Sequence, residues 1–119
     1  MDEETLQMTM LFDFFGELLT NKQREYFDLY HNEDFSLSEI AEKAGISRQG
    51  VYDIVTRAEK TLEEMELKTG VVRRWQETRL ELERAGDLTR KLLMLPDLDK
   101  NAEAIVQDLY VALESLIKE

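Results

Sequence analysis

Four side chains between Ser47 and Thr56 carry the hydrogen-bonding groups with which proteins read base edges in DNA. Arginine can pair with guanine and glutamine with adenine in the major groove. At 100° per residue, the four side chains point away from the apolar side of one helix. We predict that they are the base-edge contacts of a DNA-reading helix: Arg48, Gln49, Tyr52 and Asp53.

Seven further polar side chains are candidates for contacts to the phosphate backbone. Lysine and arginine neutralise phosphate charge, which supplies most of the sequence-independent affinity of a protein for DNA. The alternative is that each is an ordinary solvated residue, as basic side chains on the outside of a helix usually are. The candidates are Lys22, Arg24, Lys43, Ser47, Thr56, Arg57 and Lys60.

The charge of the chain argues against general DNA binding. The formal net charge is -11, with -5 over residues 1–20, -2 over residues 21–62 and -4 over residues 63–119. Residues 47–60 alone are slightly positive, at +1. We therefore expect feeble binding to random DNA at physiological salt, and specific binding only where a dimer adds avidity to two weak half-sites.

Other chemistry finds little support in the sequence. The chain has no cysteine and a single histidine, His31, which we expect to be solvated near a helix end. None of its five glycines begins a phosphate-binding G-x-x-x-x-G-K-[ST] motif. We expect no enzyme activity, no metal and no cofactor.

The N-terminal segment and the composition indicate a soluble cytoplasmic protein without a membrane partner. Three acids precede the apolar run and no basic residue does, which excludes an ordinary signal peptide. Asp13 and Glu17 interrupt a run that is too short to cross a bilayer. With 119 residues and no strand-like alternation, we expect one all-helical domain over residues 1–119.

A helix-turn-helix without a wing, over residues 20–63, is predicted to position the DNA-reading side chains. Ala41 supplies the small residue where two helices cross, Gly45 the positive φ of the turn, and Ser47 the cap of the second helix. We expect Ile46 to fill the angle between the helices. The other residues expected to pack between the two helices are Ile40, Ala44, Val51 and Ile54.

Two capping boxes mark the starts of the preceding helices, Thr20 with Gln23 and Ser36 with Glu39. Within the first of these helices, three aromatic residues are expected to face inward: Tyr26, Phe27 and Tyr30.

A broadly apolar helix is predicted over residues 4–19. Its stripe and the residues that widen it are Met8, Leu11, Phe12, Phe14, Phe15, Leu18 and Leu19. Such a helix needs cover on two sides, either within its own fold or in the seam of a homodimer.

Two amphipathic helices are predicted in the C-terminal half. Their expected inward residues are Val71, Trp75, Leu82, Ala85 and Leu92, and then Ala102, Ile105, Val106, Leu109, Ala112, Leu113 and Leu116. Gly70 either ends the DNA-reading helix or lies inside one long helix.

The DNA-reading helix continues apolar beyond the motif. The residues that carry this continuation are Val51, Val55, Ala58, Leu62, Met65 and Val72. Their three/four spacing favours a homodimer seam, and the alternative is packing against the C-terminal helices of the same chain.

The segment "LTNKQREYFDLYHNEDFSLSEIAEKAGISRQGVYDIVTRAEKTLEEME" resembles the promoter-reading C-terminal domain of bacterial sigma factors. Arg48 matches the arginine at the start of that domain's recognition helix. Gln49 stands where an acid is usual, and Gly50 and Tyr52 stand where basic residues are common. These departures weigh against recognition of a promoter element.

The whole chain, with its acidic, phenylalanine-rich start, more narrowly resembles the YlxM family of small bacterial proteins. That family is encoded beside components of the signal recognition particle and is described as regulatory. The resemblance implies a DNA-binding regulator that acts in the signal recognition particle pathway. The rival hypothesis is a protein-interaction module that engages signal recognition particle components or RNA polymerase.

Overall fold

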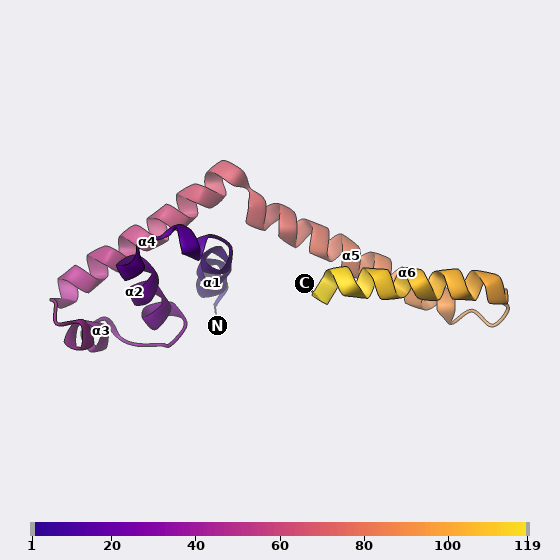
Figure 1. Cartoon of the computed structure of the whole chain (residues 1–119), viewed down its shortest axis with the longest axis horizontal. Coiled ribbons are helices and arrows are strands. Elements are labelled where there is room, and N and C mark those ends of the chain that lie inside the picture. Colours follow the sequence, from indigo (N-terminus) through magenta and orange to yellow (C-terminus); the bar gives the residue numbers. More distant parts are fainter. Residues whose placement is uncertain (1, 119) are drawn as a thin grey trace. The chain divides into compact units, whose positions relative to one another are not determined.

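The computed structural model describes residues 2–118, which form α-helices and one short 3-10 turn without any strand (Figure 1). The fold is all-α, as predicted. In chain order the elements are α1 Glu3–Phe15, η1 Gly16–Leu18, α2 Asn21–His31, α3 Leu37–Ala44, α4 Arg48–Thr69, α5 Val71–Leu93 and α6 Lys100–Lys118.

The chain divides into two compact units at the boundary between Val72 and Arg73. The first unit contains α1 to α4, and the second contains nearly all of α5 together with α6. The expectation of a single domain stays a prediction, because two such units can still unfold in one cooperative transition.

Two hydrophobic clusters form the core of the first unit, and α2 and α4 contribute to both. One joins α1, α2 and α4 around Phe27, whose ring stacks on Phe12 with 4.7 Å between ring centroids. The other joins α2, α3 and α4 around Ile40 and Val51. These clusters hold α4 in place on three neighbouring helices.

The N-terminal helix is covered on one side only. Leu11, Phe15 and Leu19 are buried as predicted, but Phe14 and Leu18 are exposed. The α-helix ends at Phe15 and gives way to a 3-10 turn, which breaks the regular spacing of the stripe. Cover on two sides is therefore not found within the described part of this unit, and the alternative of a homodimer seam at this helix stays a prediction.

Both capping boxes are present. The Thr20 hydroxyl accepts a hydrogen bond from the backbone N–H of Gln23, and the Ser36 hydroxyl accepts one from the backbone N–H of Glu39. In return, the side chains of Gln23 and Glu39 accept from the backbone N–H groups of Thr20 and Ser36. Among the three aromatic residues of α2, Tyr26 and Phe27 are buried, but Tyr30 is exposed and its inward prediction is wrong.

Gly70 ends α4. Its φ of 62° is left-handed, and its N–H donates to the Glu66 carbonyl, so that α5 starts as a separate helix.

The apolar continuation of α4 is covered within the first unit by α1, α2 and α3. Val51, Val55, Ala58 and Leu62 are buried inside this unit, so this stripe is not a homodimer seam. The contribution of α5 to the clusters is at its start, where Val72 is buried in the cluster that contains Ala58 and Leu62. Val71 packs against the same cluster, together with Met65 of α4.

The second unit is a helical hairpin in which α5 and α6 run antiparallel (Figure 1). Half-buried or buried residues recur every three or four positions: Trp75, Arg79, Leu82, Gly86, Thr89 and Leu93 on α5, and Ala102, Val106, Tyr110, Leu113 and Ile117 on α6. Five residues predicted to face inward are exposed instead: Leu92, Ile105, Leu109, Ala112 and Leu116.

Candidate nucleic-acid interface

The turn between α3 and α4 has the predicted helix-turn-helix geometry. Gly45 adopts a φ of 73° and its N–H donates to the Ala41 carbonyl at 2.9 Å. The Ser47 hydroxyl caps α4 by accepting from the Gly50 N–H at 3.0 Å. A Cβ on Gly50 would lie 3.1 Å from this hydroxyl oxygen.

The residues predicted to pack between α3 and α4 do so, with one exception. Ile40 and Val51 are fully buried, and Ala44 and Ile54 pack against them half-buried. Ile46 is exposed and does not fill the angle between the helices. Its side chain lies beside the first turn of α4, near Gly50.

The four predicted base-edge residues are all exposed at the N-terminal end of α4. Tyr52, half of whose surface is accessible, projects from the middle of this group. The Gln49 Nε2 atom donates to the Asp53 Oδ1 atom at 3.0 Å. This bond uses one amide proton, so the second proton and the amide oxygen of Gln49 remain available to an adenine.

The predicted phosphate contacts are also exposed, but they come from three helices. Thr56, Arg57 and Lys60 continue the outward face of α4 beyond the base-edge group. Lys43, at the end of α3, lies 5.7 Å from the centre of the Phe35 ring. Lys22 and Arg24 belong to the first turn of α2. Only the α4 residues and Ser47 therefore adjoin the base-edge group along one helix.

The unit that carries this face is strongly acidic. Residues 1–72 contain seven basic and sixteen acidic residues, a formal net charge of -9. Any DNA affinity must therefore come from the local arrangement on α4 and not from the overall charge of the unit.

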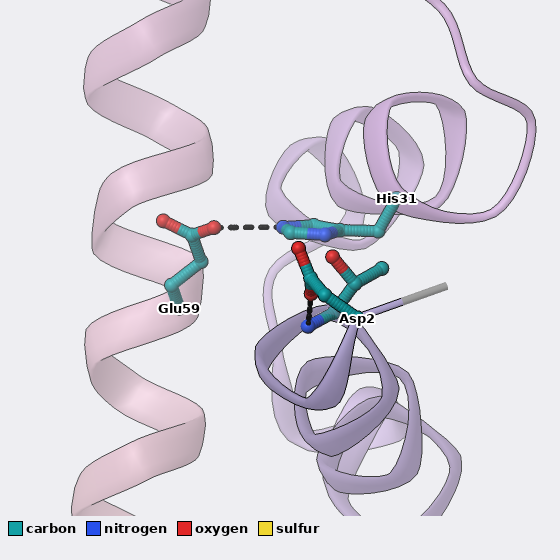
Figure 2. A network of polar contacts seen from close by, with 4 residues as sticks. Asp2, His31 and Glu59 are labelled. Carbon is teal, nitrogen blue, oxygen red and sulfur yellow. Dashed lines mark hydrogen bonds and ion pairs between the residues drawn. The ribbon is translucent and has the colours of Figure 1, made fainter.

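His31 is not the solvated residue expected from the sequence. Its Nε2 atom lies 2.7 Å from a carboxylate oxygen of Glu59, and only 11% of its side chain is accessible (Figure 2). The ring also packs on Phe27, with 4.3 Å between centroids. No sequence signal could identify this pair, because 28 residues separate its members.

An acidic cavity of about 570 Å³ adjoins this pair within the first unit. Its lining is Glu4, Thr5, Met8, Tyr30, His31, Asp34, Phe35, Glu59 and Glu63. Over residues 2–118, no three histidine, cysteine or carboxylate side chains are grouped so that they could hold a metal ion. None of the helices in that range combines the length and apolar composition needed to cross a bilayer.

Comparison with known proteins supports the helix-turn-helix assignment over most of the chain. A family described as "Putative helix-turn-helix protein, YlxM / p13 like" matches residues 2–109. A UPF0122 protein of Thermoanaerobacter sp. strain X514 is 45% identical over 112 residues, which cover 92% of this chain and 96% of the relative. A UPF0122 protein of Geobacillus kaustophilus is 47% identical over 85 residues, which cover 71% of this chain and 77% of the relative.

Proposed function

Because the chain belongs to the UPF0122 family of YlxM- and p13-like helix-turn-helix proteins, we propose that it is a regulatory protein that binds double-stranded DNA. The observation that carries the proposal is the exposed N-terminal face of α4. There, Arg48 and the hydrogen-bonded pair of Gln49 and Asp53 lie opposite a fully packed interior. Such a face can enter the major groove while α2 and α3 hold the helix rigid.

The protein acts on DNA as a homodimer. Two copies present two recognition helices, and avidity then compensates for the weak half-site affinity that the acidic charge imposes. Its place is the cytoplasm, its role is to regulate or assist the signal recognition particle pathway, and it carries out no catalysis.

A second candidate function is favoured by the net charge of -9 on residues 1–72. In this function the helix-turn-helix is a scaffold whose acidic surface engages a basic protein, either a component of the signal recognition particle or RNA polymerase. The acidic cavity beside His31 lies on this same unit, and besides Glu59, which is bonded to His31, it offers the carboxylates of Glu4, Asp34 and Glu63 to a basic side chain.

Fluorescence anisotropy distinguishes the two functions. The probes are a duplex covering the DNA upstream of the protein's own gene and a scrambled duplex of equal length. A preference for the first duplex that persists at about 150 mM salt, and is lost in Arg48→Ala with Gln49→Ala, supports DNA reading. The matched control is Arg84→Ala with Gln107→Ala, an equal change at exposed positions of the second unit.

Equal and feeble binding of both duplexes would reject the DNA-binding function. Purified signal recognition particle protein, its receptor and RNA polymerase would then be tested by pulldown at modest ionic strength. Retention of one of them that high salt abolishes is expected of an acidic docking surface.

A further inference from the structure

The helical hairpin of the second unit lacks a core of its own. Of the hydrophobic side chains between residues 73 and 118, only Val106 is buried, whereas the first unit buries twelve. The one buried polar residue of this range is Thr89. Helices in water depend on tertiary packing of an apolar face, and a hairpin with one buried hydrophobic residue gains little from packing within one chain.

An exposed apolar row runs along α6. Ile105, Leu109, Ala112 and Leu116 follow one another at intervals of four, three and four residues, which places them on one side of the helix. Ile105 is 69% accessible and Leu109 is 50% accessible. On α5, Leu88 and Leu92 form a shorter exposed row with the same spacing of four.

The two rows lie on the same face of the hairpin. On α6, Ile105 directly precedes the packed Val106, and each other member of the row likewise precedes a packed residue. On α5, Leu88 precedes Thr89 and Leu92 precedes Leu93 in the same way. Each exposed row therefore lies about 100° around its helix axis from the side that packs on the other helix. Because α5 and α6 run in opposite directions, this rotation brings both rows to the same face of the hairpin.

The opposite face of the hairpin carries more charged and polar side chains. Residues that directly follow the packed positions include Glu83, Asp87 and Arg90 on α5, and Glu103, Gln107, Glu114 and Lys118 on α6. Two ion pairs lie along this side, Arg79 with Glu83 at 3.2 Å and Arg90 with Asp87 at 2.6 Å. Leu80, Met94 and Val111 also follow packed positions and are exposed, so this face is mixed. The hairpin is thus amphipathic, with apolar side chains concentrated on one face and most of the charged ones on the other.

We propose that the leucine-rich face binds the same face of a second copy, so that the two hairpins form a four-helix bundle. The face is defined by Leu88, Leu92, Ile105, Leu109, Ala112 and Leu116. Two amphipathic two-helix layers are what such a bundle requires, and each copy supplies the cover that the other lacks. This inference names the surface of the homodimer in the proposed function, and it does not depend on DNA binding.

Charge and size favour a second copy as the occupant. Residues 73–119 contain eight basic and ten acidic residues, a formal net charge of -2, so two hairpins repel each other little and attract no charged partner strongly. A helix of 19 residues is about 28 Å long, and two side by side are about 20 Å wide, giving about 560 Å² in projection. This is of the order of the 800 Å² or so that each partner buries in a standard interface.

Equilibrium sedimentation of the full chain at tens of micromolar tests the proposal. We expect twice the chain mass of 14.0 kDa for the unaltered protein and for Val111→Glu. Val111 is a matched control, because it is a 59% accessible apolar residue of α6 outside the row. Leu109→Glu and Ile105→Glu should raise the dissociation constant of the dimer at least about a hundredfold, because they bury an unpaired charge.

Circular dichroism keeps the test conclusive. Both altered side chains are exposed in one chain and lie outside the core of the first unit, so any loss of helix on dissociation should be confined to the hairpin. A single-chain mass for the unaltered protein would overturn the proposal, as would a dimer that persists in both Leu109→Glu and Ile105→Glu. Arg48→Ala with Gln49→Ala should leave the mass doubled. A failure of DNA reading therefore appears in the anisotropy alone, and a failure of the bundle appears in the sedimentation alone.

Discussion

His31 joins the end of α2 to the middle of α4 through its Nε2 atom, which lies 2.7 Å from the Glu59 carboxylate. The contact is well shielded from water on the histidine side and is reinforced by the packing of the ring on Phe27. It therefore helps to hold α4, the helix that carries the DNA-reading face, against its support.

Replacing His31 should destabilise the first unit. His31→Ala removes both the hydrogen bond and the ring packing, and we expect the free energy of unfolding to fall by about 1–3 kcal/mol. Urea denaturation followed by circular dichroism measures this change. Glu64→Gln, at an exposed position of the same helix as Glu59, is the control and should change stability by less than about 0.5 kcal/mol.

Replacing two glycines by alanine should change the stability of the protein in opposite directions. Gly45→Ala meets no atom within 4 Å, but its φ of 73° strains any side chain, and a loss of about 1–2 kcal/mol is expected. Gly86→Ala lies inside α5 with ordinary contacts of 3.8 Å to Glu114 and Ile117. It should stabilise the protein by about 0.5–1 kcal/mol. Thermal unfolding compares both variants, and a stabilised Gly45→Ala would contradict the left-handed turn.

The capping box at the start of α3 should be visible in a titration. The backbone N–H of Ser36 donates to the Glu39 carboxylate and lowers its pKa below the usual 4.5. A lowered pKa means that this group stabilises the fold above pH 4.5 and loses that contribution as the pH falls through its folded pKa. Carboxyl NMR should show a midpoint below 4.5 for Glu39. Ser36→Pro, which removes the N–H donor, should return the midpoint toward that value if the chain stays folded.

Residues that contact phosphate and residues that contact bases should affect the salt dependence and the sequence preference of DNA binding differently. Arg57→Ala and Lys60→Ala should weaken binding to the upstream and scrambled duplexes alike, and each should reduce the salt slope by about one. Arg48→Ala should instead cost about 1–3 kcal/mol on the upstream duplex alone. Anisotropy titrations over a range of salt concentrations measure both effects. Equal losses on both duplexes for Arg48→Ala would assign this arginine to phosphate.

The local structure of the helix-turn-helix could be predicted from the sequence alone. Thr20, Ser36 and Ser47 cap helices through atoms no more than three residues away, and Gly45 is required by a φ that belongs to its own backbone. Such interactions depend on near neighbours in the chain, and for that reason residue type and spacing suffice to predict them.

Which part of each broad apolar stripe is buried depends on how the helices pack against one another. A helix contacts its neighbours over a limited part of its circumference, so Leu11 is buried while Phe14 is exposed, and Val106 is buried while Ile105 is not. The pairing of His31 with Glu59 arises in the same way, from two helices brought together by the core between them. Burial and long-range pairing depend on where neighbouring helices lie, and no periodicity within one helix contains that information.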